Sequence, residues 1–370
     1  MSDGLPGSGE GEIGATRVLT PDGWVGPAVI EVAEGRIVAI RPTTADQPDR
    51  TIVPGFIDVQ VNGIGADDVS AEDADWARLN AHLLAQGVTT WCPTVVTSAI
   101  ETYQPVLARI AALDRRDRHG PIPDMAGVHL EGPFLGGAPG AHRRDLICPV
   151  DLDFIRGLPP VVRIMTLAPE IAHAGEAIVA LVEHGVLPAL GHSTATFDQS
   201  VAAAHAGARL VTHLFNGMAG MHHREPGLAG AALADPRLTP SIIADNVHVH
   251  PAALATAFRA SQGSGPILVT DAVAWRSARL GRQTIEHRDG APRLRDGTLA
   301  GSDLTMDQAI RNVVAAGVPL EAAVTAATST PAHLLGLHDR GVLAPGRRAD
   351  LVAFRPDLTI EQAWLGGIAE

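Results

Sequence analysis

Cysteine and basic residues are scarce in this chain. Only two cysteines, Cys92 and Cys148, occur among 370 residues, so the sequence has neither a disulfide framework nor a paired-cysteine metal motif. Lys and Arg together number 28 against 41 Asp and Glu, which gives a formal net charge of −13. Nucleic-acid binding requires clustered cations and is therefore excluded. Free thiols are typical of a reducing compartment, so the predicted location is the cytoplasm.

Long apolar segments are missing as well. No run approaches the ~20 apolar residues of a membrane-spanning helix, which predicts no membrane association. The N-terminus also lacks the basic flank and apolar stretch of a signal peptide, and residues 1–15 are predicted to be a disordered tail. The chain is nevertheless 46% hydrophobic, which is enough for a barrel of about 250 residues and a smaller partner.

Eight short apolar runs recur along the middle of the chain, separated by Ala-rich segments of helical periodicity. The runs cover residues 51–61, 88–96, 125–131, 162–168, 186–192, 209–213, 241–244 and 267–271. Buried parallel strands have continuous apolar sequences and need helical crossovers. The pattern therefore predicts an α/β fold, a (β/α)₈ TIM-type barrel over residues 54–339. Strand-like segments at 16–53 and 340–370 predict a small β-sandwich domain formed from both chain termini.

Two segments break this alternation. Residues 217–232 carry Met, His, Arg and Pro, and residues 275–300 carry charges and several glycines. Loops of this length in a compact domain are usually functional. In a barrel both are expected on the catalytic face.

Three potential metal ligands stand at the ends of three different runs. Glu131, His192 and His213 occupy these positions, and the carboxyl ends of barrel strands meet at one rim. Any one of them alone is better explained as a hydrogen-bonded structural residue. Together, one carboxylate and two imidazoles with space for water form the donor set of a catalytic site.

Asp271 ends the last run and is predicted to be the general base and acid, with a helix-capping role as the alternative. A divalent metal lowers the pKa of bound water towards about 7. Asp271 can accept a proton from this nucleophile and return it to a departing amine. The strand-end residues thus predict amide hydrolysis.

Longer motifs extend this interpretation over nearly the whole chain. They lie at residues 53–58, 127–134, 190–193, 211–218, 222–227, 244–248, 269–272, 299–306 and 345–351. In this order they resemble the N-acetylglucosamine-6-phosphate deacetylases of the amidohydrolase superfamily. The resemblance implies hydrolysis of N-acetyl-D-glucosamine 6-phosphate to glucosamine 6-phosphate and acetate in amino-sugar catabolism.

The resemblance also implies residue roles. Glu131, His192 and His213 correspond to the metal ligands, Asp271 to the acid/base, and His142 to the residue that polarises the acetyl carbonyl. Asn216, Gly217 and Ala300 correspond to sugar contacts, and Arg224 and His248 to a phosphate clamp that is completed across a homodimer. The alternative for Arg224 is a solvated loop charge or a partner of Glu225.

The sequence departs from the superfamily pattern at two places. Gln60 and Asn62 stand where many amidohydrolases have His-x-His, and amides are poor ligands for Zn²⁺. This predicts a vestigial second metal position and one divalent ion per subunit, with Zn²⁺ favoured and Fe²⁺ or Co²⁺ as alternatives. Trp275 follows Asp271 where small residues are usual. It is either a packed lid residue or a side chain that presses on the acetyl pocket or the sugar face and so affects acyl range and epimer preference.

Two other functions use the same residues. A deacetylase of N-acetylgalactosamine 6-phosphate, or of another N-acyl amino sugar, would have the same strand ends. An inert sugar-phosphate-binding barrel is an alternative of another class. The complete set of metal ligands and base argues against it, because a binding protein does not need an open metal site.

Overall fold

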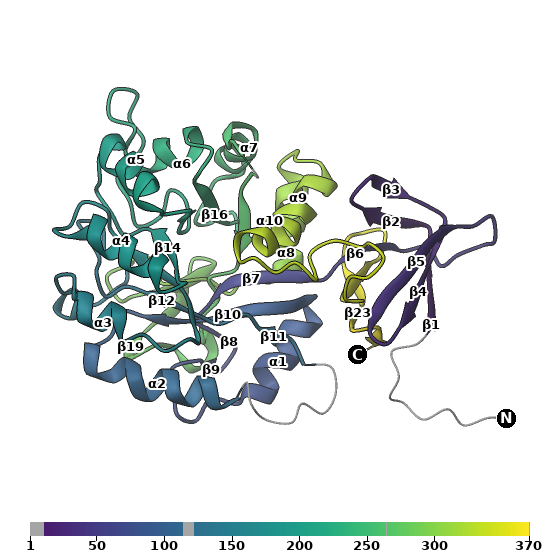
Figure 1. Ribbon diagram of the computed structural model, residues 1–370, viewed down its shortest axis with the longest axis horizontal. Coiled ribbons are helices and arrows are strands. Elements are labelled where there is room, and N and C mark those ends of the chain that lie inside the picture. The colour runs from purple at the N-terminus through teal and green to yellow at the C-terminus, as the bar shows by residue number, and fades with distance from the viewer. Residues whose placement is uncertain (1–10, 114–121, 264, 370) are drawn as a thin grey trace.

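The computed structural model describes residues 11–113, 122–263 and 265–369. A large body of alternating strands and helices is joined to a smaller all-β part that contains both ends of the chain (Figure 1). The predicted tail at residues 1–10 lies outside the described residues. Residues 11–15, which the sequence analysis assigned to that tail, form strand β1 (Gly11–Ala15). Ile13 and Ala15 on this strand are buried, which explains why it is ordered.

Eight parallel strands form the barrel: β7 (Phe56–Val61), β10 (Val88–Val96), β12 (Val128–Glu131), β13 (Val162–Leu167), β14 (Leu187–Leu190), β15 (Leu210–Val211), β16 (Thr239–Ile243) and β17 (Ile267–Val269). Neighbours along the chain are hydrogen-bonded to one another from β7 to β17. Just beyond β17 the Asp271 N–H donates to the Gln60 carbonyl at 2.9 Å, and the Asn62 N–H donates to the Ala272 carbonyl at 2.8 Å. These bonds connect the last strand to the first, and the predicted barrel fold is confirmed.

Helices cover the outside of the barrel. They are α1 (Trp76–Ala85), α2 (Ile100–Leu113), α3 (Leu152–Arg156), α4 (Ala174–Glu183), α5 (Phe197–Ala206), α6 (Gly227–Ala234), α7 (Pro251–Ala260), α8 (Met306–Ala315), α9 (Leu320–Ala327) and α10 (Ser329–Leu334), with a short 3₁₀ turn η1 (Arg144–Leu146). Local sequence fixes several helix starts: the Thr196 side chain accepts from the Gln199 N–H, and the Gln199 side chain accepts from the Thr196 N–H. No helix in the described part of the chain has the length and apolar content needed to cross a membrane.

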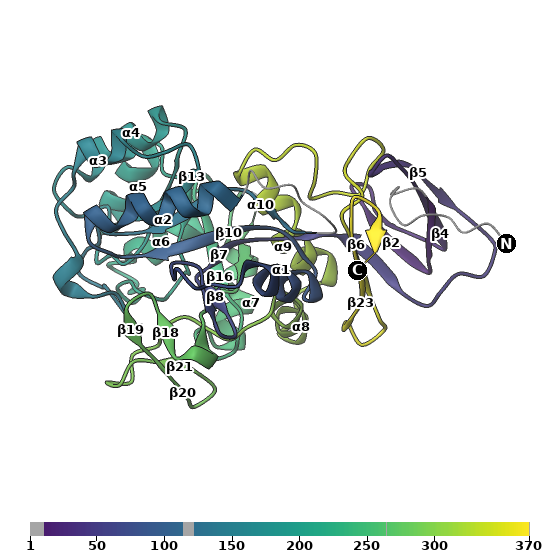
Figure 2. The ribbon, with the colours of Figure 1, turned by 90° about the horizontal axis from the view of Figure 1, so that it is seen from below.

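The two long segments have different structures. Residues 217–226 form a loop that leads into α6. Residues 275–300, called the flap here, contain a 3₁₀ turn and two hairpins: η2 (Trp275–Ser277), β18 (Arg279–Leu280) with β19 (Gln283–Thr284), and β20 (Glu286–Arg288) with β21 (Ala291–Arg293). Figure 2 shows these hairpins projecting on one side of the barrel. Two short strand pairs, β8 (Gly63–Ile64) with β9 (Asp67–Asp68) and β11 (Asp124–Met125) with β10, complete the body.

The smaller part consists of two sheets. One has the order β1, β4 (Ala28–Ala33), β5 (Arg36–Pro42); the other has the order β24 (Ile368–Ala369), β23 (Ile360–Leu365), β22 (Leu351–Phe354), β6 (Thr51–Pro54), β2 (Arg17–Thr20), β3 (Gly23–Val25). The second sheet therefore contains strands from both termini. Alternate residues of both sheets, such as Ile30, Ile37, Ile52 and Leu351, are buried in one shared apolar cluster.

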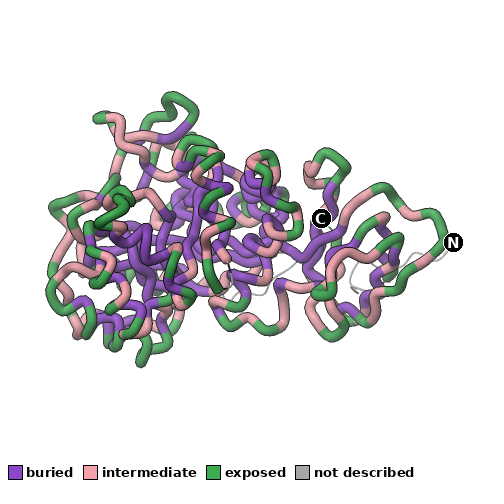
Figure 3. Tube along the Cα trace, turned by 90° about the horizontal axis from the view of Figure 1, so that it is seen from above, coloured by how far each residue is buried: buried purple, intermediate pink, exposed green. Residues whose placement is uncertain are grey.

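Buried residues are concentrated in the barrel and continue into the strands that join it to the smaller part (Figure 3). Phe56 on β7 and Phe354 on β22 are both fully buried, with ring centroids 5.8 Å apart. A polar contact lies nearby: Arg340 Nη1 donates to Asp124 Oδ2 at 2.8 Å, and Arg348 donates to the same carboxylate. Leu84 on α1 also packs with Ala363 and Leu365 on β23. Apolar, aromatic and ionic contacts thus join the barrel and the second sheet.

The aromatic contact yields a prediction about stability. Phe354→Ala should lower the free energy of unfolding by about 3–5 kcal/mol, because it leaves a cavity beside Phe56 in a fully buried site. The measurement is the urea midpoint followed by Trp fluorescence. Phe258→Ala on α7, where the ring is half-buried, is the matched control and should cost less than half as much. Equal shifts for the two variants would contradict this account of the joint.

Candidate active site

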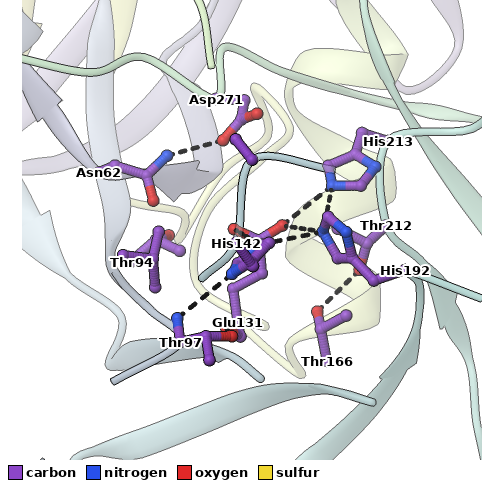
Figure 4. A network of polar contacts seen from close by, with 12 residues as sticks. Asn62, Thr94, Thr97, Glu131, His142, Thr166, His192, Thr212, His213 and Asp271 are labelled. Carbon is purple, nitrogen blue, oxygen red and sulfur yellow. Dashed lines mark hydrogen bonds and ion pairs between the residues drawn. The ribbon is translucent and has the colours of Figure 1, made fainter. Parts of the chain in front are cut away.

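Four side chains from different strand ends meet at one cavity. Glu131 is the last residue of β12, and His192, His213 and Asp271 each lie two residues beyond β14, β15 and β17. All four line a cavity of about 160 Å³, together with His142 from the loop after β12. Figure 4 shows the imidazoles gathered around Glu131, with Asp271 on the other side. The structure therefore brings the predicted metal ligands and the predicted base together.

Three of these side chains have the spacing of metal ligands. Glu131 Oε1 lies 3.0 Å from His192 Nε2 and 2.9 Å from His213 Nε2, and the two imidazole nitrogens are 3.1 Å apart. Tetrahedral Zn²⁺ with bonds of 2.0–2.1 Å separates its ligand atoms by about 3.3 Å. A small widening of the triad therefore accommodates a divalent cation, and one carboxylate with two imidazoles is a donor set that suits Zn²⁺.

Backbone contacts on the far side of each ring support this interpretation. His192 Nδ1 lies 3.3 Å from the Ala138 carbonyl oxygen, and His213 Nδ1 lies 3.1 Å from the Asn216 carbonyl oxygen. A carbonyl can only accept, so each Nδ1 carries the proton and each Nε2 directs a lone pair at the centre of the triad. This is the tautomer that metal-binding histidines require.

His142 differs from the other two histidines in the group that faces its Nδ1. Its Nε2 is also close to the triad, 3.2 Å from His192 Nε2 and 3.7 Å from Glu131 Oε2, so Glu131, His142 and His192 form a second possible ligand set. However, the Thr97 N–H donates to His142 Nδ1 at 3.4 Å. Neutral His142 then carries its proton on Nε2 and is a hydrogen-bond donor towards the cavity. The geometry favours His213 over His142 as the third ligand.

Gln60 and Asn62 face the carboxylates as donors. Gln60 Nε2 donates to Glu131 Oε1 at 3.0 Å and to Asp271 Oδ1 at 3.1 Å, and Asn62 Nδ2 donates to Asp271 Oδ1 at 2.7 Å. A carboxylate accepts hydrogen bonds, so the amide nitrogens must point at it. Their N–H groups occupy the space that imidazole lone pairs would take in a two-metal site. This agrees with the expectation of a weak second position.

The two buried carboxylates have opposite pKa shifts. Burial acts to raise the pKa of Glu131, but the His142, His192 and His213 rings around it hold that pKa well below its usual value. Burial and the nearby charge of Glu131 raise the pKa of Asp271 to about 8, although the hydrogen bond from Asn62 opposes this. Two carboxyl groups with separated pKa values are typical of one ligand and one proton carrier.

Gly217 packs directly against both ligand rings. A β-carbon at this position would lie 2.8 Å from His192 Nδ1 and 3.4 Å from His213 Cε1, and its φ is +56°. Both the close approach and the left-handed backbone require glycine. Gly217 therefore positions the imidazoles in addition to lining the cavity.

The predicted sugar and phosphate contacts are only partly brought together. Asn216, Gly217 and His248 line the cavity. Ala300 is fully buried in an apolar cluster beside it, and its neighbours Leu299 and Gly301 line the cavity instead. Arg224 borders a separate hollow of about 440 Å³ next to α5 and does not reach the cavity of its own chain.

Two buried polar residues that the sequence did not single out hold the strands next to the site in place by hydrogen bonds. Asp58 accepts hydrogen bonds from the Thr270 hydroxyl at 2.6 Å and from the Thr270 N–H at 3.3 Å, and so fixes the residue before Asp271. His129, two residues before Glu131, contacts the Val59 carbonyl at 3.0 Å and Thr166 Oγ1 at 2.8 Å. Polar residues inside otherwise apolar runs were the available signal.

Comparison with known proteins decides the family. The Amidohydrolase family matches residues 51–368 of the chain. The chain belongs to the amidohydrolase family. Among curated relatives of this amidohydrolase, the N-acetylgalactosamine-6-phosphate deacetylase of Escherichia coli O157:H7 is 37% identical over 95% of this chain and 97% of its own. The N-acetylglucosamine-6-phosphate deacetylase of Bos taurus is 39% identical over 95% and 91%.

Solved structures agree with the sequence comparison. The N-acetylglucosamine-6-phosphate deacetylase of Thermotoga maritima superposes with a TM-score of 0.89 at 31% identity, covering 97% of this chain and 99% of its own. A mutant of the Mycobacterium smegmatis deacetylase, solved in complex with N-acetyl-D-glucosamine-6-phosphate, has a TM-score of 0.89 at 35% identity and the same coverage. The amidohydrolase described here is accordingly an enzyme of the hydrolase class.

The different tautomers of His213 and His142 lead to a prediction about how metal content responds to substitution. His213→Gln should weaken metal binding by about 100-fold or more, because it removes a ligand. His142→Gln is the matched control and should retain close to one metal ion per chain, as in the unsubstituted enzyme. Both are measured by elemental analysis after dialysis against a weak chelator. Loss of metal from His142→Gln with retention in His213→Gln would show that the ligand set is the other one.

Proposed function

We propose that this amidohydrolase removes the acetyl group from N-acetyl-D-glucosamine 6-phosphate and produces glucosamine 6-phosphate and acetate. The observation that carries the proposal is the cavity in which Glu131, His192 and His213 face Asp271 with His142 beside them. Relatives named as deacetylases of this sugar phosphate support the choice of substrate. Those of Bos taurus and Vibrio furnissii are 39% and 34% identical, each over 95% of this chain.

One divalent ion per subunit is part of the proposal. Held by Glu131, His192 and His213, it would polarise the acetyl carbonyl and lower the pKa of a bound water towards about 7. A donor set of one carboxylate and two neutral imidazoles suits Zn²⁺, with Fe²⁺ or Co²⁺ as alternatives. The donors of Gln60 and Asn62 support a single ion.

His142 and Asp271 carry out the other steps of the proposed reaction. His142 Nε2–H donates to the acetyl carbonyl oxygen and stabilises the negative charge that develops there. Asp271 accepts a proton from the attacking water through Oδ2, because Gln60 and Asn62 already occupy Oδ1. Asp271 then gives this proton to the sugar nitrogen as the C–N bond breaks, so that the amine leaves neutral together with acetic acid. The acetic acid loses its remaining proton to water and becomes acetate.

Phosphate recognition is proposed to involve two subunits. The His248 ring lines the cavity, and its Nδ1 is held by Asp245 Oδ2 at 2.6 Å. Arg224 lies outside this cavity on an exposed loop, where Met221 is 58% exposed. In a homodimer Arg224 would contribute its guanidinium to the cavity of the other subunit and bind the phosphate with two donors.

A second candidate substrate is the galacto epimer. The relative that acts on N-acetylgalactosamine 6-phosphate by name is 37% identical over 97% of its length, and both epimers present the same acetamido group to the strand-end residues.

The cytoplasmic location also remains a proposal. It is supported by the two free cysteines, Cys92 and Cys148.

Acetate release tests the function directly. The metal-loaded enzyme should turn over N-acetylglucosamine 6-phosphate with a kcat/KM at least about tenfold above those of the galacto epimer and of unphosphorylated N-acetylglucosamine. Asp271→Asn should lower kcat by about 10²–10⁴-fold, because it cannot carry the proton. Faster turnover of the epimer would favour the second candidate. Unchanged turnover by Asp271→Asn would contradict the mechanism, and substrate binding without any acetate release would favour the inert barrel.

Mixed dimers test the shared phosphate clamp. Arg224→Ala and Asp271→Asn should each be poorly active alone on the phosphorylated sugar. Co-expressed with two different affinity tags, they should form a heterodimer that recovers roughly a quarter to a half of the wild-type kcat, since one of its sites has both groups intact. The control is Arg224→Ala that also carries Asp271→Asn, co-expressed with the wild type. Absence of recovery in a purified heterodimer would place the clamp within one chain.

A further inference from the structure

A second hollow adjoins the catalytic cavity. It has a volume of about 140 Å³ and lies between the start of α2, the loop after His142, and the flap. Three residues line both spaces: Val96 at the end of β10, and Leu280 and Gln283 on the β18–β19 hairpin. These three side chains are therefore the partition between the cavity and the hollow, and they are called the wall here.

The wall is on the side of the cavity that an acyl group must occupy. Asn216 and His248 line the cavity from the loops after β15 and β16, and they are called the polar side here, although the apolar Ile243 at the end of β16 also lines it. Val96, Ala141 and Leu280 belong to one apolar cluster and are called the apolar side. Sugar hydroxyls and a phosphate need polar partners, and an alkyl group needs apolar ones. With the acetyl carbonyl oxygen placed at His142 Nε2, the sugar lies towards the polar side. The methyl group of the acetyl then points at the wall.

The wall is rigid. Val96 and Leu280 are 9% and 5% exposed, and both pack in one apolar cluster with Val273 and Ile285. Gln283 Nε2 donates to the Ala141 carbonyl at 2.7 Å, which ties the hairpin to the loop that bears His142. The hairpin turn is also fixed, because the Gly281 N–H donates to Asp68 Oδ2 at 2.6 Å.

Trp275 does not form this boundary, although the sequence made it a candidate. It packs against the same apolar cluster, and its ring centroid lies 5.3 Å from that of His287. It lines neither the catalytic cavity nor the adjoining hollow. Leu280, five residues further along the flap, has the position for which Trp275 was considered.

We propose that Leu280, together with Val96 and Gln283, determines the length of the acyl group that this enzyme removes. The wall confines the catalytic cavity to an acetyl group. The hollow behind it offers volume for a longer acyl chain beside Ala99 and Leu146, although Thr97, Ser98, Thr102, Arg143 and Arg282 also line it. A water needs only about 10–15 Å³ of such volume, so the hollow holds several heavy atoms once the wall is opened. This inference rests on the proposed deacetylase function and adds a specificity determinant to it.

The test compares N-acetyl-, N-propionyl- and N-butyrylglucosamine 6-phosphate as substrates of the metal-loaded enzyme. In Leu280→Ala the ratio of kcat/KM for the butyryl to the acetyl substrate should rise at least about tenfold over the wild type, since one methylene in a tight pocket changes discrimination by about 10–200-fold. Leu294→Ala is the matched control, because Leu294 packs on the same cluster but lines neither space. Its ratio should stay within about twofold of the wild type.

Each outcome is decisive. An unchanged ratio in a Leu280→Ala enzyme that still releases acetate overturns the wall, and so does a wild type that accepts butyryl as readily as acetyl. A rise of the same size in Leu294→Ala would show general loosening and would also overturn it. Should Leu280→Ala fail to fold, Val96→Ala opens the other half of the wall and carries the same expectation. A wild type without turnover of any of the three sugars would instead overturn the proposed function, and the inference with it.

Discussion

The buried carboxylate of Glu131 is the group on which the site depends. A charge that is only 3% exposed is costly unless several partners compensate it. Here Gln60 donates a hydrogen bond to Glu131, and His192 and His213 lie 3.0 and 2.9 Å from it, where a cation shared by the three side chains would complete the compensation. Each of these partners comes from a different part of the barrel. No single helix or hairpin could supply them together, because parallel strands bring distant segments to one rim only when the barrel closes. The tertiary fold and the donor set therefore depend on each other. Without the closed barrel the charge of Glu131 would lack its partners, and without Glu131 the two imidazoles would have no common partner.

Backbone groups then give three chemically identical side chains different roles. His192 and His213 each have a carbonyl behind Nδ1, whereas His142 has the N–H of Thr97. An acceptor behind the ring leaves a lone pair at the front, and a donor behind the ring leaves a proton there. In the proposed mechanism the metal ligand His192 and the carbonyl polariser His142 can thus lie 3.2 Å apart and keep different functions. The amides of Gln60 and Asn62 are oriented by their neighbours in a similar way, since their N–H groups donate to carboxylates.

Much of this arrangement could be predicted from the sequence, for identifiable reasons. The apolar run at 88–96 coincides with β10 because a strand buried on both faces carries no charged residue, and charged or imidazole side chains at the ends of such runs stand out. The wall was not predictable in this way, since Val96 and Leu280 are apolar residues in apolar surroundings and carry no chemical signal. Strand β1 was not predicted because it is held by pairing with β4. The alternation of apolar and polar residues in this short segment is too weak to indicate a strand. The separation of Arg224 from His248 depends on where a loop lies on the surface, and sequence periodicity contains no information about that.

Backbone strain also determines where the side chains of the site lie, and it cannot be recognised from the local sequence. His192, His213 and Asp271 have φ values of 49°, 32° and 49°, a region that costs non-glycine residues of order 1–3 kcal/mol each. These conformations end the regular alternation of the strand and turn the side chain towards the barrel axis. They persist because neighbouring strands hold the backbone: the His213 N–H donates to Ser241 Oγ at 2.7 Å, and the Asp271 N–H to the Gln60 carbonyl at 2.9 Å. Asp58 adds a further restraint through Thr270. His192, His213 and Asp271, the proposed ligands and base, are consequently placed by contacts between strands, and a loop of the same sequence outside the barrel would relax to another conformation.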